Sequence, residues 1–169
     1  MIKQLLILGS GQLGRVVAEL AKQQEFTDVR FLDDYSHGCE ILGACQEYEQ
    51  YKTFTYAYPA FGNDKLRLEW IEKLRIAGFL LPTLIHHTAY VSPTVRMSDA
   101  VLVLPKAVIH ANTIVGEGTI VNIGVLIDHD VTINKGAHLC TGAIINPRSN
   151  IPEFTKIKAG SIIDEQTVF

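Results

Sequence analysis

Cysteine is scarce in this sequence, which contains only Cys39, Cys45 and Cys140 among 169 residues. Their odd number excludes complete pairing within one chain, and no two of them have the spacing of a zinc-binding or redox-active pair. Such cysteine usage is typical of the reducing cytosol rather than of secreted proteins. We therefore predict a cytoplasmic protein without a disulfide framework, and we assign these cysteines no role.

Charge of one sign and long apolar runs are lacking as well. The sequence has 15 basic and 18 acidic residues, a formal net charge of -3 at pH 7, and no basic block. Proteins that bind nucleic acid or anionic lipid normally concentrate Lys and Arg on one surface. The apolar N-terminal segment ends at Gly9, far short of the roughly 20 apolar residues that cross a bilayer, and has no signal-cleavage pattern. We expect neither nucleic acid nor a membrane as a partner.

From residue 85 onward, the sequence repeats with a strict period of six. Fourteen aliphatic residues occupy this register: Ile85, Val91, Met97, Val103, Ile109, Val115, Val121, Ile127, Ile133, Leu139, Ile145, Ile151, Ile157 and Ile163. The fourth position after each holds a residue no larger than valine, from Ala89 to Thr167. A period of six fits neither a helix nor a half-buried strand. It fits short strands joined by tight corners, with one aliphatic residue of each strand stacked inward.

This repeat resembles that of the hexapeptide-repeat proteins, whose chains fold into a left-handed parallel β-helix with three hexapeptides in each coil. The local composition agrees, because β-branched residues dominate and Gly, Asn, Asp and Pro mark the corners. Residues 85–169 are therefore predicted to form an all-β domain of about four to five coils. The resemblance also implies a homotrimer, in which active sites lie in the clefts between neighbouring β-helices.

Residues 1–80 have the pattern of an α/β domain instead. The apolar run 4–8 predicts a buried strand, the sequence GSGQLG at 9–14 predicts a tight turn into a helix, and the run 29–32 predicts a second strand. The residues predicted on the buried face of that helix are Val16, Val17, Leu20 and Ala21. This order of elements is a Rossmann-like βαβ unit.

A third strand and a second helix are predicted to complete this domain. The segment 55–63 favours a strand that ends in a loop, and Asp64 is a suitable cap for the helix after it, which Gly78 ends. We predict two domains, residues 1–80 and 85–169.

The glycine-rich turn has the pattern of a phosphate-binding loop. Gly9, Gly11 and Gly14 would permit the turn and let a phosphate approach the N-terminus of the helix, where the dipole favours an anion. Asp33, about twenty residues on, suits a ribose hydroxyl. A dinucleotide site is one interpretation, but the α/β part is only half the size of a dinucleotide-binding fold, so a nucleotide-sugar fits better. The alternative is that these glycines only shape the turn.

The segment Asp128-His129-Asp130 has the composition of a general base with its orienting acid. Neither His129 nor His138 falls on the two inward registers of the repeat, so both should face outward or lie at corners. A carboxylate beside an imidazole fixes its tautomer, which leaves the other nitrogen free to accept a proton. Acyl transfer also needs a donor for the developing oxyanion, and His138 or a corner N–H group could supply it.

A zinc site is the competing interpretation of the histidines. It would use His110, His129 and His138, which are spaced 19 and 9 residues apart. In the hexapeptide-fold carbonic anhydrases, two of the ligands are five residues apart. We therefore predict no metal.

Several stretches together resemble one family, the bacterial sugar acetyltransferases of the NeuD and PglD type. These enzymes acylate sialic acid or nucleotide-linked amino sugars with acetyl-CoA. The matching stretches are ILGSGQLGRVVAEL, FLDD, AFGNDKLR, LIHHTAYVSPTV and IVNIGVLIDHDVTINKGAHLCTGA, within residues 4–143. The last of them is the most specific.

The resemblance implies a role for each matching residue. His129 corresponds to the catalytic base and Asp130 to the acid that holds it. Acetyl-CoA is implied to contact His138, Gly142 and Ala143. The nucleotide-sugar or sialic acid is implied to contact Gly9, Ser10, Gly11, Asp33, Asp34, Gly62, Asn63 and Asn122.

The predicted function is therefore transfer of an acetyl group from acetyl-CoA to an amine, or a hydroxyl, of a nucleotide-activated sugar or sialic acid. Because the hexads end at Ile163, whereas members of this family usually carry further coils, the alternative is a nucleotide-sugar-binding or scaffold trimer that does not bind acetyl-CoA. A third interpretation is a nicotinamide-binding regulator built on the GSGQLG loop.

Overall fold

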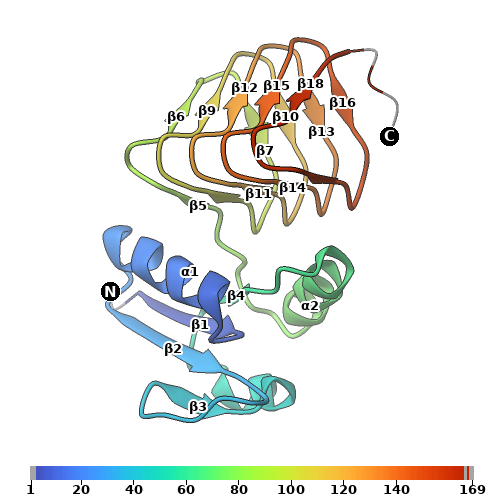
Figure 1. The fold of residues 1–169 in the computed structure, drawn as a ribbon. Coiled ribbons are helices and arrows are strands. Elements are labelled where there is room, and N and C mark those ends of the chain that lie inside the picture. Colours follow the sequence, from blue (N-terminus) through green and yellow to red (C-terminus); the bar gives the residue numbers. More distant parts are fainter. Residues whose placement is uncertain (1–2, 166, 168–169) are drawn as a thin grey trace. The chain divides into compact units, whose positions relative to one another are not determined.

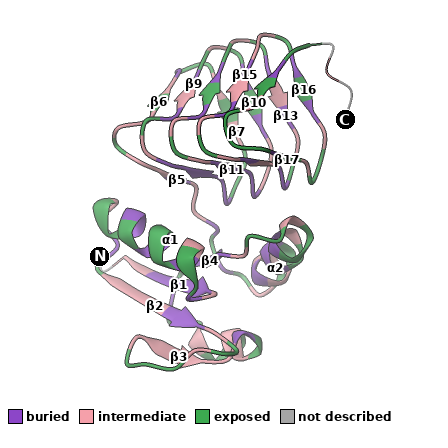
Figure 2. Cartoon of the chain, in the orientation of Figure 1, coloured by how far each residue is buried: buried purple, intermediate pink, exposed green. Residues whose placement is uncertain are grey.

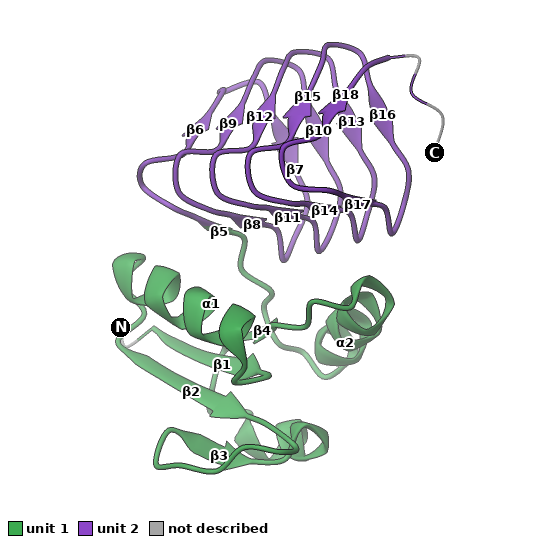
Figure 3. Cartoon of the chain, viewed as in Figure 1, with its two compact units in different colours: residues 1–84 green, residues 85–169 purple. Residues whose placement is uncertain are grey.

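The structure is a computed structural model that describes residues 3–165 and 167. It divides into two compact units, residues 1–84 and 85–169 (Figure 3). The outer ends of the two predicted domains, residues 1–2 and 168–169, lie outside the described residues. Within the part of the chain that is described, no helix is long and apolar enough to cross a membrane.

The N-terminal unit is a parallel sheet with helices (Figure 1). Its elements are β1 (Gln4–Leu8), α1 (Gln12–Gln23), β2 (Asp28–Leu32), β3 (Ile41–Gly43), the 3-10 helix η1 (Cys45–Tyr51), β4 (Tyr56–Pro59) and α2 (Asp64–Ile76). The strand order is β3-β2-β1-β4, with every neighbouring pair parallel. The predicted Rossmann-like βαβ start is confirmed, whereas β3 and η1 were not predicted.

The helix α1 packs more closely on the glycine-rich loop than the sequence predicts. Val17, Leu20 and Ala21 are buried as expected, but Val16 is 36% exposed, so its predicted place on the buried face is wrong. Gly14 takes that place instead, because a Cβ at Gly14 would lie 2.0 Å from the Gly9 carbonyl oxygen. The third glycine of the motif thus lets the helix touch the loop.

The N-terminus of α2 differs from the prediction by one residue. The cap is Asn63, whose side chain accepts a hydrogen bond from the Leu66 N–H at 2.9 Å. Asp64 is the first helical residue and forms an ion pair at 2.9 Å with Arg67, whose side chain is fully buried. Asp64 is therefore not the cap, because its carboxylate neutralises a buried guanidinium instead. Gly78 follows the helix in the left-handed region, with φ at 89°.

The C-terminal unit is the predicted left-handed parallel β-helix. Its two-residue strands are β5 (Leu84–Ile85), β6 (Tyr90–Val91), β7 (Arg96–Met97), β8 (Leu102–Val103), β9 (Val108–Ile109), β10 (Ile114–Val115), β11 (Ile120–Val121), β12 (Leu126–Ile127), β13 (Thr132–Ile133), β14 (His138–Leu139), β15 (Ile144–Ile145), β16 (Asn150–Ile151), β17 (Lys156–Ile157) and β18 (Ile162–Ile163). They form three parallel sheets, β5-β8-β11-β14-β17, β6-β9-β12-β15-β18 and β7-β10-β13-β16. Each strand pairs with the third strand along the chain, so every coil contains three hexads.

The two inward registers build the core of this unit, as the period predicts. In the middle coils both are buried, for example Ile127 at 1% exposure and Val131 at 0% (Figure 2). Aliphatic residues stack on each other in register, as Ile109, Ile127 and Ile145 do. Burial of apolar surface in this column stabilises one coil on the next.

The corners share a backbone conformation. The residue three places after each inward aliphatic residue has φ between 55° and 71° along the stretch of Ala100, Lys106, Asn112, Gly118, Gly124, Asp130, Gly136, Gly142, Arg148, Phe154 and Gly160. Glycine adopts this conformation without steric cost, whereas other residues pay roughly 1 kcal/mol. Asn112, Asp130 and Arg148 stack at one corner, and the described positions of that corner from Asn112 onward contain no glycine.

Candidate active site

His129 and Asp130 form a hydrogen-bonded pair at the corner between β12 and β13. The ring Nδ1 of His129 lies 2.7 Å from Oδ2 of Asp130. Asp130 holds the left-handed corner position, with φ at 58°. This local turn explains how adjacent residues on a sharp corner face one another, where an extended strand would place their side chains on opposite sides.

The electrostatics of the pair fix the tautomer. Hydrogen bonds from His129 and from Asn112 lower the pKa of Asp130, and burial opposes this only in part. Asp130 is therefore ionised at neutral pH and can only accept, so Nδ1 of His129 must carry the proton it shares. In the neutral imidazole, the lone pair then lies on Nε2. The His129 side chain is 41% exposed, so a substrate can reach it.

Three further polar residues surround this pair. The amide Nδ2 of Asn112 donates to Oδ1 of Asp130 at 3.0 Å. Oδ1 of Asp128 accepts from the His129 backbone N–H at 2.7 Å and lies 3.7 Å from Nδ1 of His110. The rings of His110 and His129 are 6.4 Å apart. Asn112 was not predicted from the sequence, although its spacing of 18 residues from Asp130, one full coil, was a signal for this contact.

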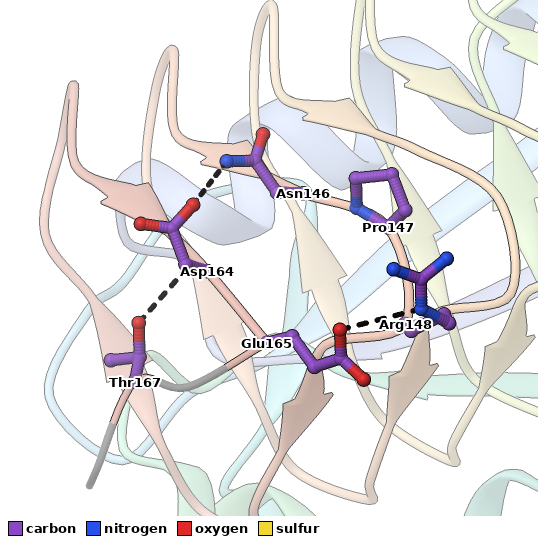
Figure 4. A pocket seen from close by; sticks show the side chains of 6 residues that line it. All are labelled: Asn146, Pro147, Arg148, Asp164, Glu165 and Thr167. Atoms are coloured by element: carbon purple, nitrogen blue, oxygen red, sulfur yellow. Dashed lines mark hydrogen bonds and ion pairs between the residues drawn. The ribbon is translucent and has the colours of Figure 1, made fainter.

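Two hollows adjoin this corner. The first, of about 340 Å³, is lined by Val108, His110, Leu126, Ile127, Asp128, Ile144, Ile145 and Asn146. The second, of about 510 Å³, lies one coil further on (Figure 4) and is lined by Asn146, Pro147, Arg148, Asp164, Glu165 and Thr167. In the second hollow, Nε of Arg148 lies 3.3 Å from Oε2 of Glu165, and Asn146 donates to Asp164. Apolar and polar groups therefore both line the surface next to His129.

The structure does not bring His138 to His129 within one chain. His138 lies on β14, between Ile120 and Lys156 of the neighbouring coils, and its two ring nitrogens are buried. That sheet forms a different face of the β-helix, since the His129 corner joins the other two sheets. The predicted role of His138 near the thioester stays a prediction.

The other predicted residues of this unit lie at a second corner. Asn122 precedes β12 and accepts from the Ile123 N–H at 2.8 Å. Gly142, with φ at 67°, and Ala143 precede β15, one coil later. One sheet thus separates this corner from His129, and the predicted contacts of these residues with substrate stay predictions. Among the described residues, no group of three or more His, Cys, Asp or Glu side chains could hold a metal ion.

In the N-terminal unit, Asp33 locks the glycine-rich loop. Its Oδ2 accepts from the backbone N–H and the hydroxyl of Ser10, at 2.6 and 2.8 Å. Its Oδ1 accepts from the N–H groups of Tyr35 and Ser36, both at 2.9 Å. Burial raises the pKa of Asp33, but these hydrogen bonds outweigh it and hold that pKa far below its ordinary value.

This arrangement changes the interpretation of Asp33. Four donors occupy both carboxylate oxygens, so the side chain supports two loops and has little capacity left for a sugar hydroxyl. Asp34 is exposed, and its Oδ1 accepts from the Cys45 N–H at 2.8 Å. Direct contact between Asp33 and the sugar substrate stays a prediction. In the structure, this residue holds the loops after β1 and β2 together.

The predicted substrate residues of this unit follow three neighbouring strands. Gly9 to Gly11 follow β1, Asp33 and Asp34 follow β2, and Gly62 and Asn63 follow β4. These strands are adjacent and parallel, so the three loops meet at one edge of the sheet, where ligands of α/β folds bind. A Cβ at Gly62 would meet no atom within 4 Å, so the loop surface there is open. A hollow of about 310 Å³ lies beside the β2 loop, lined partly by Asp33, Asp34, Ser36 and His37.

The sequence of the N-terminal unit matches the model of a known protein domain. Residues 4–74 match the model of the PglD N-terminal domain. This match covers most of the N-terminal unit, which is therefore similar to the PglD N-terminal domain.

Solved structures match nearly the whole chain. The acetyltransferase domain of PglB from Neisseria gonorrhoeae FA1090, in complex with acetyl coenzyme A, is 29% identical; the match covers 96% of this chain and 82% of that chain, with a TM-score of 0.90. PerB from Caulobacter crescentus, in complex with CoA and GDP-perosamine, is 26% identical over 97% of this chain and 90% of that chain, with a TM-score of 0.84. A histidine-to-asparagine variant of the perosamine N-acetyltransferase from the same organism, with the same ligands, is 25% identical over the same shares, with a TM-score of 0.86.

These matches confirm the resemblance to NeuD/PglD-type sugar acetyltransferases and the predicted combination of a Rossmann-like domain with a left-handed β-helix. They also confirm the predicted enzyme class, a CoA-dependent acetyltransferase, since the related structures contain acetyl-CoA or CoA.

Proposed function

We propose that this protein transfers the acetyl group of acetyl-CoA to the amine of a nucleotide-linked amino sugar, with His129 as the general base. The observation that carries the proposal is the 2.7 Å contact between Nδ1 of His129 and ionised Asp130 at an exposed corner. Because Nδ1 is bound to Asp130, Nε2 is the ring nitrogen that is proposed to accept the proton of the substrate. The related PglB domain binds acetyl-CoA, and PerB binds CoA and GDP-perosamine, which supports both substrates.

The proposed chemistry needs one proton acceptor and one oxyanion donor. The neutral amine attacks the thioester carbonyl carbon, and Nε2 of His129 takes a proton from the nitrogen as the new C–N bond forms. The tetrahedral intermediate collapses with cleavage of the C–S bond, and the imidazolium returns the proton to the departing thiolate. A corner N–H group, or His138 from another copy of the chain, would stabilise the oxyanion. A hydroxyl acceptor would follow the same steps.

The N-terminal unit is proposed to hold the nucleotide part of the acceptor. Its three loops meet at the edge of the sheet that suits a nucleotide, and the N-terminus of α1 there offers free N–H groups and a favourable dipole. The contacts are proposed for Gly9, Ser10, Gly11, Asp34 and the Gly62-Asn63 loop. Sialic acid is an alternative acceptor, as in part of the family that the sequence resembles.

We also propose a homotrimer in the cytoplasm. One face of the β-helix carries outward-facing apolar residues in every coil, and they pair in register along β6, β9, β12, β15 and β18: Tyr90, Val108, Leu126, Ile144 and Ile162. Exposed fractions of 51% for Tyr90 and 62% for Ile162 are large for such side chains. A second copy of the chain would cover this face. The separate positions of His129 and His138 also favour a site completed by a neighbouring subunit.

Isothermal titration with acetyl-CoA, combined with a thiol-release assay on a panel of UDP-, GDP- and CMP-linked amino sugars, tests the function. We expect heat of binding, and thiol release that requires both an acceptor and His129, with a loss of about 10²- to 10⁴-fold in His129→Ala. Absence of acetyl-CoA binding would contradict the proposal and favour the nucleotide-sugar-binding scaffold. If the His129→Ala variant still released thiol at the wild-type rate, His129 would not be the general base, but the proposed substrates would stand.

A further inference from the structure

We propose that Asn112 is a positioning residue that holds the Asp130 carboxylate in the orientation that fixes the tautomer of His129. The inference rests on the proposed function of His129. Asn112 is one full coil before Asp130, 18 residues away in the sequence, and it matches none of the residues that the sequence analysis assigned to the site.

Each oxygen of the Asp130 carboxylate has its own hydrogen-bond partner. Oδ2 faces Nδ1 of His129 at 2.7 Å, and Oδ1 accepts from Nδ2 of Asn112 at 3.0 Å. A carboxylate bound at one oxygen can rotate about its last side-chain bond, whereas one bound at both oxygens in different directions cannot. Asn112 therefore removes the rotation that would break the bond to His129.

Asn112 is itself held in place by the coil before it. Its backbone N–H donates to Oγ1 of Thr94 at 2.9 Å, and the Asp130 N–H donates to the Ala111 carbonyl at 2.9 Å. The chain from Thr94 through Asn112 to Asp130 and His129 thus joins three successive coils. A group bound in this way is a suitable support for a catalytic side chain.

Backbone conformation gives an independent argument. Asn112 adopts φ of 60°, a conformation that glycine adopts without cost. At equivalent positions, the corner after the next sheet has Gly118 and Gly136 together with Ala100 and Phe154, and the remaining corner has Gly124, Gly142 and Gly160 together with Lys106. Asparagine tolerates the left-handed region better than most residues, and its amide here has a partner. Left-handed non-glycine residues occur at all three corners, but among the described positions with positive φ the Asn112 corner is the one that contains no glycine, which supports a task of this corner beyond folding.

The charge balance favours a neutral amide at this position. The titratable and charged groups around His129 are Asp128, Asp130, His110 and Arg148. An amide donates to Asp130 without adding charge, whereas a carboxylate in its place would repel Asp130 and favour the imidazolium. Asn112 thus supports the Asp130 carboxylate without adding a negative charge beside His129.

The test compares Asn112→Gly and Asn112→Asp with the wild type. Asn112→Gly relieves the backbone strain and removes the donor, so we expect an unchanged or higher melting temperature and a kcat about 10-fold lower, with the KM of both substrates within about twofold. For Asn112→Asp we expect the acidic limb of the pH–rate profile to move to higher pH, because the added charge stabilises the imidazolium. If Asn112 served folding alone, its substitution would neither lower kcat at constant KM nor shift the pH–rate profile.

Lys106→Gly is the matched control, because Lys106 is an exposed non-glycine residue with φ of 62° at another corner. It should gain the same relief of strain without loss of kcat. Full activity of Asn112→Gly, in a protein whose His129→Ala variant is inactive, would overturn the positioning role while leaving the proposed function intact. If no sugar acceptor is turned over, ¹⁵N NMR of the His129 ring still tests the positioning role of Asn112, because it reports the tautomer directly. The Nδ1–H tautomer should dominate in the wild type and lose population in Asn112→Gly, and an unchanged tautomer ratio would refute the inference.

Discussion

The carboxylate of Asp33 receives two hydrogen bonds from Ser10 on one oxygen, at 2.6 and 2.8 Å, across the ends of two adjacent strands. The same carboxylate holds the turn after β2 through its other oxygen. One side chain therefore ties the glycine-rich loop after β1 to the loop after β2. The shape of the proposed nucleotide edge therefore depends on this tie as well as on the glycines.

Asp33→Asn should destabilise the N-terminal unit. The amide NH₂ group would replace one carboxylate oxygen and would face hydrogen-bond donors of Ser10, or of Tyr35 and Ser36, in place of an acceptor. We expect the free energy of unfolding to fall by about 1–3 kcal/mol. The pKa of Asp33 is lowered by folding, so its contribution is fully present above the ordinary Asp pKa of about 3.9 and is lost as the pH falls below that value. Urea unfolding of both proteins between pH 7 and pH 3 measures this. A constant difference across that range would contradict it.

Gly14 and Gly11 should respond differently to the same substitution. A Cβ at Gly14 would lie 2.0 Å from the Gly9 carbonyl oxygen, whereas a Cβ at Gly11 would have no neighbour within 4 Å. Gly14→Ala should therefore push α1 away from the loop and cost about 1–3 kcal/mol of stability. Gly11→Ala should leave stability within about 0.5 kcal/mol, yet raise the KM for the nucleotide-sugar if phosphate approaches the backbone there. Thermal unfolding and steady-state kinetics on both variants separate the two effects.

Arg67→Met should be strongly destabilising. The guanidinium is fully buried and donates to the Phe61 carbonyl at 2.8 Å and to Asp64 at 2.9 Å. Its removal leaves Asp64 without its buried partner, at an expected cost of about 3–5 kcal/mol. The control is Arg75→Met on the same helix, whose exposed pair with Glu72 at 2.9 Å should be worth less than about 1 kcal/mol. Chemical denaturation gives both values, and equal losses would refute the argument.

Leu126→Glu should dissociate the proposed trimer. Leu126 lies in the middle of the outward apolar face and is 44% exposed in the single chain, so a copy packed there would bury a carboxylate without a partner. Light scattering coupled to gel filtration should then give the 18.7 kDa of one chain instead of three times that mass. Ile114→Glu is the control, since Ile114 is 37% exposed on another sheet. Loss of assembly in both variants would argue against this face as the interface.

The architecture of both units could be predicted because it depends on local patterns. The six-residue period predicts the β-helix, since each hexad builds the same strand and corner. Two elements were missed for lack of such a pattern. β3 has only three residues, Ile41–Gly43, and η1 is a 3-10 helix without helical periodicity. Asn63 and Asp64 are both good helix caps, so only their contacts decided between them.

The site was predicted less completely, because distance along the sequence misleads in a β-helix. His129 and His138 are nine residues apart, which is half of an 18-residue coil, and they accordingly lie on different sides of it. Asn112 is twice as far from Asp130 in sequence, and the two side chains touch. Pairing residues by whole coils, rather than by proximity in the sequence, would have identified this contact.

The stacking of corners also restricts how such a chain can change in length. Deleting or inserting a single hexad between Asn112 and Asp130 would keep every inward residue in register, and so preserve the fold, but it would carry Asn112 to a different corner. Only gains or losses of three hexads return each side chain to its old neighbour. Length variation near His129 should therefore come in steps of 18 residues, while six-residue steps remain tolerable in coils that carry no chemistry.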